Sequence, residues 1–292
     1  MAKKNTILKY DWRLGSADAE FCVDERLYPN APMENLPLLA SMQCSNAKEK
    51  EFTNLDLRHM NEFASKCERK LGFFFAGYIH TAVMRRYFIY LPDEEAGSHF
   101  TQLAEKQRNL DVRVEIKSDP SWSVYFKLLY PDTAKMQTVR NGEIIKMHYD
   151  NGDSTAARRL NLHMYFKSEP IRMQFEEAAR LEGFAIGNTE ERYPDGDQHD
   201  EDHKAEFNAS QTPKADASHG EHLRAEFNAS QTPKADASYG EHQLIYGVVL
   251  HRICAMKKRE VDAVTVHAIR IAERFGGALA YWDCPIVPRA GK

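Results

Sequence analysis

The sequence of 292 residues has no long hydrophobic run. A helix that crosses a membrane needs about 20 consecutive apolar residues, and no stretch of this chain comes near that length. The opening residues MAKKNTILKYDW begin with a pair of lysines that no apolar segment follows, which is not the pattern of a signal peptide. These absences predict a cytoplasmic protein without a membrane-spanning helix.

Cysteine is scarce as well. The five cysteines are far apart, odd in number and form no CxxC pair: Cys22, Cys44, Cys67, Cys254 and Cys284. Free cysteine in a reducing compartment is usually a small, packed residue. We therefore expect reduced and mostly buried thiols, with neither disulfides nor a cysteine metal site.

An excess of positive charge is also missing. The formal net charge is −4, with 42% hydrophobic and 28% charged residues, which is an ordinary soluble composition. Binding nucleic acid through bulk electrostatics needs a cationic surface. Two short basic clusters, Arg85-Arg86 and residues 257–259, are interpreted as solvated turns, so we expect no direct nucleic-acid binding. No phosphate loop, GxSxG or HExxH motif is present, and thus no motif predicts an enzyme or a cofactor.

What the sequence does have is a regular order of strands and helices. Alternating apolar and polar residues predict strands, and apolar residues three and four apart predict helices with one buried face. The first half has predicted strands at 7–13, 20–26, 36–43, 73–80, 86–91 and 111–117, and helices at 93–108 and from Asn54 or Asp56, as the cap, to Gly72. The second half has predicted strands at 160–167, 184–186, 243–255 and 278–287, a helix from Ser168, as the cap, to Gly183, and a helix from Asp262, as the cap, to Gly276-Gly277.

Each half therefore contains the order β-α-β-β-α-β. We predict an α+β protein with two tandem ferredoxin-like domains, residues 1–152 and 153–292, of which the first has an extra N-terminal hairpin. A helix that Asp132 caps, and that runs to about Tyr149, joins them.

A near-exact duplication interrupts the second half. Residues 205–222 read AEFNASQTPKADASHGEH, and residues 225–242 repeat them with Tyr239 in place of His219. The whole segment 188–242 has few large apolar side chains, so it buries too little surface to offset the entropy of ordering. We predict a disordered, expanded hairpin loop.

Three groups of residues have the chemistry of a site and also a plainer explanation. In DQHDEDH, the group His199, Asp200, Asp202 and His203 would bind a divalent metal if it lay on a helix, and a solvated acidic loop explains it otherwise. Cys284 follows Asp283, which opposes thiolate formation, so we interpret it as a core or edge residue. The third group, His148, Asp150 and Asp153, would suit a metal or an acid–base pair, and a polar helix end explains it otherwise.

Two resemblances to known families follow from specific phrases. FEEAARLEGFAI, GVVLHRICAM, VDAVTVHAIRIAERFGG and ALAYWDCPIV, within residues 160–288, resemble the regulator of ribonuclease E activity B family. In that family this region is ferredoxin-like, and its best-known member binds and inhibits the endoribonuclease that degrades messenger RNA. The acidic tails and strong negative charge of that family are absent here. SDPSWSVYFKLLYPD and GYIHTAVMRRYFIYLPD make residues 11–152 similar to the bacterial domain of unknown function 695 family, which has no established activity.

These resemblances imply a non-enzymatic regulator that acts by protein–protein contact. Its second domain would dock on an endoribonuclease of the ribonuclease E kind and reduce its activity in RNA turnover. We expect no catalytic residues, cofactor, metal or membrane partner. The alternative is an enzyme, or a protein that binds a small molecule or metal, with a site between the two domains near Trp122, Tyr125, His148 and Asp153.

Deletion of residues 205–224 removes one copy of the duplication. Because this segment has little apolar surface to bury, we expect the melting temperature to shift by less than about 2 °C in a thermal unfolding experiment. A fall of about 4 °C or more, equal to about 1 kcal/mol or more, would show that the copy is packed into the fold.

Overall fold

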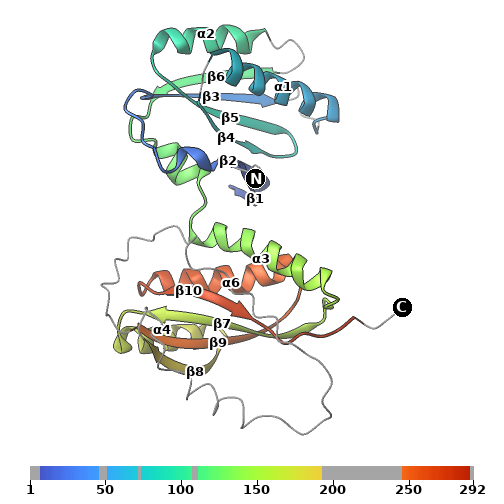
Figure 1. Cartoon of the computed structure of the whole chain (residues 1–292), viewed down its shortest axis with the longest axis vertical. Helices are drawn as coiled ribbons and strands as arrows, with labels where there is room; N and C mark the ends of the chain where they lie inside the picture. The colour runs from blue at the N-terminus through green and yellow to red at the C-terminus, as the bar shows by residue number, and fades with distance from the viewer. Residues whose placement is uncertain (1–6, 46–50, 72–73, 107–110, 193–244, 290–292) are drawn as a thin grey trace, which may run out of the picture. The chain divides into compact units, whose positions relative to one another are not determined.

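The computed structural model of the protein describes residues 7–45, 51–71, 74–106, 111–192 and 245–289. The chain divides into two compact units, Met1–Glu143 (unit 1) and Ile144–Lys292 (unit 2), and the division falls inside helix α3 (Thr133–Asp150). Each unit is built on one antiparallel sheet with helices, which confirms the predicted two-domain α+β class (Figure 1). The duplication and the DQHDEDH segment lie outside the described residues. None of the described helices is long and apolar enough to cross a membrane.

Unit 1 contains a six-stranded sheet in the order β1-β2-β4-β5-β3-β6. Its strands are β1 (Ile7–Leu14), β2 (Ala17–Asp24), β3 (Leu38–Ser45), β4 (Phe74–His80), β5 (Met84–Leu91) and β6 (Asp111–Ser118). Helices α1 (Asn54–Leu71) and α2 (Glu94–Glu105) pack on one face, where Met60 and Phe100 meet alternate strand residues such as Met42. On the other face a second core forms around Trp122 and the short helix η2 (Tyr125–Leu129). Both faces of this sheet are therefore covered.

The aromatic phrase SDPSWSVYFKLLYPD is part of this second core. Trp122 is fully buried, and its indole ring stacks on Tyr90 with 3.8 Å between the ring centroids. The indole Nε1 donates to the Leu36 carbonyl at 3.1 Å. Trp122 has the left-handed φ of 52°, and a side-chain turn at Asp119 holds it there. The Asp119 carboxylate accepts from the Ser123 amide at 2.8 Å, from the Val124 amide at 3.1 Å and from the Tyr90 hydroxyl at 2.8 Å.

Unit 2 contains a four-stranded sheet in the order β10-β7-β9-β8. Its elements are β7 (Ala157–Phe166), α4 (Glu169–Leu181), β8 (Ala185–Arg192), β9 (Ile245–Ala255), α6 (Lys258–Glu273) and β10 (Ala278–Asp283). Alternate β7 residues, Leu160, Leu162, Met164 and Phe166, are fully buried. Helices α4 and α6 pack on this face, and Phe166 lies against Phe175 of α4 with 4.5 Å between the ring centroids.

The two sheets share one strand order. When the strands of each β-α-β-β-α-β series are counted along the chain, the fourth pairs with the first, the first with the third, and the third with the second. In unit 1 this series is β3 to β6, and the hairpin β1-β2 extends the sheet beyond β4. The predicted hairpin is thus an addition to one edge.

Several local predictions were wrong for identifiable reasons. Thr53 caps α1, because its hydroxyl accepts from the Asp56 amide at 3.2 Å while the Asp56 carboxylate accepts from the Thr53 amide at 2.9 Å. Helix α6 begins about one turn before Asp262, whose carboxylate instead accepts from the Lys258 ammonium at 2.7 Å. Arg85 does not lie in a solvated turn, because it belongs to β5 and is only 4% exposed.

Strand ends also differ from the prediction. Strand β8 continues to Arg192, past the predicted start of the loop at residue 188, and pairs with β9 through polar residues that show no apolar alternation. A register shift between Ile186 and Thr189 further hides the strand period. Strand β10 ends at Asp283, since Pro285 has no amide hydrogen for a ladder bond.

Replacing Asp119 with asparagine tests the turn below Trp122. Burial alone would raise the Asp119 pKa, but bonds from the Val124 amide, Ser123 and Tyr90 outweigh it and lower the pKa. Because the unfolded pKa is about 3.9, the stabilisation is complete above about pH 4 and is lost as the pH falls through the folded pKa. We expect Asp119→Asn to cost unit 1 about 2–3 kcal/mol at pH 7 and to flatten this acid dependence.

The measurement is hydrogen-exchange mass spectrometry of β3 and β5 peptides in the full chain, from pH 7 down to the start of acid unfolding. Asp18→Asn is the control, because the Asp18 side chain is 95% exposed. Equal protection in the two variants would contradict the assigned role of Asp119.

Candidate functional site

The open face of unit 2 is the side of its sheet opposite α4 and α6. Because side chains alternate along a strand, the β7 residues between the buried positions point to this face, among them Asn161 and His163. Strand pairing places Asp283 beside Asn161, Tyr281 beside His163, and His251 on the other side of Asn161. Three strands thus bring polar and aromatic side chains together on one surface.

A chain of hydrogen bonds connects these residues; we name it the Asp283 network. The Asp283 carboxylate accepts from Asn161 Nδ2 at 2.6 Å and lies 2.8 Å from His163 Nε2. Asn161 Oδ1 lies 2.9 Å from His251 Nδ1, so the network crosses from β10 through β7 to β9. Gly187 on β8 makes room for it, since a Cβ there would come within 2.1 Å of His251 Nε2.

The charges of the Asp283 network follow from its surroundings. Burial alone would raise the Asp283 pKa, but the bonds from His163 and Asn161, with the charges of His163 and Arg159, lower it. Burial, and then the charges of Arg159 and His163, lower the pKa of His251. At neutral pH the network therefore contains an ionised carboxylate and a neutral His251 imidazole.

The network also fixes an aromatic pair at the surface. The His163 ring stacks on Tyr281 at 4.1 Å between centroids with an interplanar angle of 16°. Tyr281 is 47% exposed, and Ile253 of β9 is 74% exposed on the same face. An Asp–His pair of this kind orients the general base in hydrolases, but no hydroxyl or thiol of a described residue bonds to His163. The arrangement therefore suits recognition better than proton transfer.

The predicted group near the end of α3 is partly assembled. His148 Nδ1 lies 2.7 Å from Asp153 Oδ2, whereas Asp150 pairs with Lys146. The nearly fully buried Asp153 also accepts two bonds from Arg158 Nη1, at 2.7 and 2.9 Å, and one from the Val287 amide at 2.9 Å. Arg158 Nη1 in turn donates to the Pro285 carbonyl at 2.8 Å.

This buried pair fastens the segment after β10 to the start of β7. Burial alone would raise the Asp153 pKa, but the bonds from Arg158, Val287 and His148 outweigh it and lower the pKa. No cluster of three or more histidine, cysteine or acidic residues that could hold a metal occurs among the described residues. We interpret Asp153 and Arg158 as structural.

The aromatic residues named with them belong to a different network. Trp122 and Tyr125 are fully buried in unit 1, where the Tyr125 hydroxyl donates to the Asp24 carbonyl at 2.9 Å. Of the four residues of the alternative site, Trp122 and Tyr125 are thus core aromatics of unit 1. The other two, His148 and Asp153, lie in unit 2 and bond to each other.

The cysteines behave as packed thiols where they are described. Cys22, Cys44 and Cys254 are buried, and Cys284 is half-buried with its sulfur 3.8 Å from that of Met256. Burial raises the pKa of Cys284 to about 11, so it is a protonated thiol at neutral pH. The Cys67 side chain lies outside the described residues.

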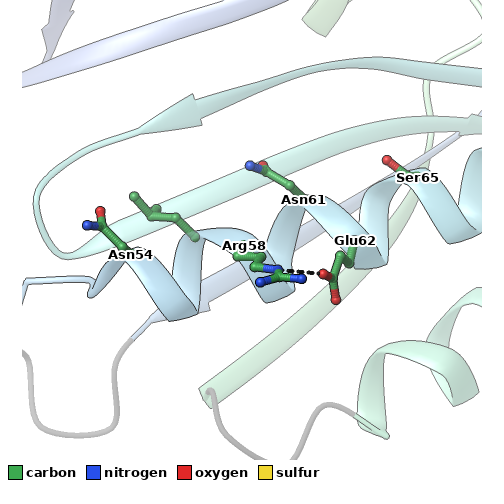
Figure 2. A pocket seen from close by; sticks show the side chains of 6 residues that line it. Asn54, Arg58, Asn61, Glu62 and Ser65 are labelled. Atoms are coloured by element: carbon green, nitrogen blue, oxygen red, sulfur yellow. Dashed lines mark hydrogen bonds and ion pairs between the residues drawn. The ribbon is translucent and has the colours of Figure 1, made fainter.

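A shallow depression of about 430 Å³ lies along α1 of unit 1. It is lined by Asn54, Leu57, Arg58, Asn61, Glu62 and Ser65. Figure 2 shows that all of them come from this one helix, with Arg58 and Glu62 joined by an ion pair of 2.9 Å. A depression with one helical wall does not enclose a ligand, so by itself it is not a binding site.

Comparison with known proteins gives a family match for part of unit 1. Residues 13–130 match the family described as "Family of unknown function (DUF695)", which confirms the prediction for the N-terminal half. No curated protein matches the chain. One solved structure, "Crystal Structure of an Unknown Protein from Galdieria sulphuraria", is 10% identical with a TM-score of 0.20, covering 86% of this chain and 98% of that chain. The resemblance of residues 160–288 to the ribonuclease regulator family stays a prediction.

Removal of the Arg158 guanidinium tests the structural role of the buried pair. Arg158→Met leaves the Asp153 carboxylate buried without its main partner, and breaking such a pair typically costs about 3–5 kcal/mol. We expect that loss in the free energy of unfolding of unit 2, measured from hydrogen exchange of β7 peptides in the full chain at pH 7. Arg159→Met is the control, because Arg159 is the next residue but is exposed. Equal effects of the two changes would refute the structural role of the Asp153–Arg158 pair.

Proposed function

We propose that the protein is a non-enzymatic regulator of RNA turnover in the bacterial cytoplasm, and that the open face of unit 2 docks on an endoribonuclease of the ribonuclease E kind and inhibits it. The observation behind this proposal is the exposed Tyr281, stacked on His163 and accompanied on the same face by the exposed Ile253.

The physical properties of this face favour docking. Tyrosine is enriched among the residues that dominate binding energy at interfaces, because its ring provides a large contact area with few rotatable bonds. The Asp283 network holds His163, and through it the Tyr281 ring, before any partner arrives. A preordered surface loses less side-chain entropy on binding, so more of the contact energy is available for affinity.

A protein partner fits this face better than RNA does. A nucleic-acid surface needs a cluster of cations, whereas the open face places Arg159 close to the ionised Asp283. An RNA-binding sheet also presents stacked aromatics on its central strands. Here β9, one of the two central strands, presents Val249, His251 and Ile253, and the exposed aromatic Tyr281 lies on the edge strand β10. Single-stranded RNA is therefore the competing occupant that the experiment has to distinguish.

The resemblance to the ribonuclease regulator family supports the choice of partner. Its phrases correspond to α4, β9, α6 and β10, and the strand order β10-β7-β9-β8 is compatible with a ferredoxin-like domain. The phrase GVVLHRICAM forms most of β9, which contributes His251 and Ile253 to the open face. We infer that the resemblance and the exposed surface describe the same docking site.

Substitution of Ile253 with serine tests the docking face. In a binding assay with purified endoribonuclease, we expect the full chain to bind and to slow cleavage of a labelled RNA, and Ile253→Ser to weaken binding about tenfold, or ~1.4 kcal/mol. Leu181→Ser is the matched control: Leu181 is an aliphatic residue that is 81% exposed, but it lies on α4.

Three results would refute the proposal. The first is that the wild-type chain neither binds nor inhibits the endoribonuclease. The second is that both serine variants behave like the wild type. The third is that the chain binds the labelled RNA without the endoribonuclease, with an affinity that Ile253→Ser reduces. The last result would assign single-stranded RNA to the face instead of a protein.

A further inference from the structure

Arg85 of unit 1 is a buried cation in an unusual environment. It lies on β5 beneath α1 and is 4% exposed. Its guanidinium carbon lies 4.4 Å from the centre of the Tyr78 ring and 6.0 Å from that of Tyr87. Within the described parts of the chain no carboxylate lies within ion-pair distance of it. Two aromatic rings therefore take the place that an acidic partner normally has.

The hydrogen bonds of Arg85 leave one edge of the guanidinium unused. Nη1 donates to Asn61 Oδ1 at 2.9 Å and to the Tyr87 hydroxyl at 3.4 Å. Nε is buried and has no partner among the described residues. The edge formed by Nε and Nη2 is one of the two edges with which arginine binds a carboxylate or phosphate through parallel hydrogen bonds.

The rings do not offset the cost of burying this charge. A cation–π contact contributes on the order of 0.5–2 kcal/mol, whereas removing an ion from water costs several kcal/mol even after the protein relaxes. Buried arginine is accordingly almost always paired with an anion. An anion at the Nε edge would supply the missing compensation.

A second unpartnered donor lies beside Arg85. His80 on β4 is the direct cross-strand partner of Arg85, and such pairs have Cβ atoms about 4.5–5.5 Å apart. His80 Nδ1 is buried without a hydrogen-bond partner in the described part of the chain. Burial, and then the charge of Arg85, lower the His80 pKa, so the ring is neutral at pH 7 and Nδ1 is free to carry a proton.

The acidic side chain in the same cross-strand row is already engaged. Glu20 is the cross-strand partner of His80 on β2, and its carboxylate accepts from the Tyr78 hydroxyl at 2.9 Å. The cross-strand row Glu20–His80–Arg85 thus contains one carboxylate, and that carboxylate bonds to the Tyr78 hydroxyl. The Nε edge of Arg85 therefore still has its N–H donors available. Asn61 bonds to Arg85 and also lines the depression on α1 (Figure 2), so this one side chain links the guanidinium to the surface of unit 1.

We propose that unit 1 binds a small oxyanion, the carboxylate or phosphate group of a metabolite, through the Nε edge of Arg85 with His80 Nδ1 as a second donor. The ligand enters beside Asn61 on α1. This site is independent of the docking face of unit 2.

The test compares melting temperatures of the full chain in sodium chloride, sodium acetate and sodium phosphate at equal ionic strength and pH 7.5. For an oxyanion at about 50 times its Kd, we expect the transition of unit 1 to rise by about 4–8 °C in the wild type. Phosphate also stabilises proteins without binding a site, so the decisive quantity is the difference between variants. Arg85→Gln should show no rise in melting temperature with either anion. Arg85→Lys keeps the charge but lacks the parallel N–H donors of the guanidinium, so it should weaken anion binding at least about tenfold.

Arg13→Gln is the matched control, because it removes one positive charge from unit 1 at a side chain that is 69% exposed. It should keep the full rise. An equal rise in Arg85→Gln, or none in the wild type with either anion, would overturn the proposal. A rise with acetate alone would assign a carboxylate ligand, and a rise with phosphate alone a phosphate ligand.

A second measurement needs only the wild type, in case Arg85→Gln does not fold. In protein labelled with ¹⁵N-arginine, the buried Nε–H of Arg85 exchanges slowly with solvent and is identified by that protection. Its resonance should move in a saturable way when acetate or phosphate is added in place of chloride. No saturable movement with either anion would show that water satisfies Nε, and the proposed site would be wrong.

Discussion

Every charge that a protein buries needs compensation, and this constraint determines the local architecture of both units. In unit 2, Asp153 and Arg158 neutralise each other, and their remaining bonds fasten the chain after β10 to the start of β7. In unit 1, Asp119 has no cation among its described partners and is compensated by amides and hydroxyls, which fold the backbone into the turn that holds Trp122. Arg85 is the exception, since its described contacts are two aromatic rings, an amide oxygen and a hydroxyl.

The same strand order leaves different surfaces accessible because the sheets are covered differently. In unit 1 the helices cover one face, and Trp122 with η2 covers the other, so polar groups such as Arg85 end up in the interior. In unit 2 the helices α4 and α6 both lie on one face, and the Asp283 network forms on the opposite face with Tyr281 exposed. The oxyanion proposed for unit 1 would therefore have to enter the fold, whereas the partner proposed for unit 2 would rest on a surface.

Much of the fold was predictable because it depends on local periodicity. Alternation identified β6 and β7, and the turn residue Gly183 has the left-handed φ of 83° that a helix end requires. The site residues were harder to find, since Asp283 and His163 are 120 positions apart and only the sheet brings them together. Only the start of β8 was predicted, and its polar continuation past Ile186 was missed for a related reason, because pairing with β9 and not apolar alternation defines that part.

Arg85 shows that a usable signal was present in the sequence. Counted in steps of two from Arg85, the next β5 residues are Tyr87, Ile89 and Leu91, and a face with those three side chains is a core face. Treating Arg85 and Arg86 as one basic pair hid the burial of Arg85. Adjacent strand residues point to opposite sides of a sheet, and of these two only Arg86 is partly exposed. An arginine in register with three large apolar residues is better read as a buried charge that needs an anion, and that alternation test applies to any strand with a basic pair at its start.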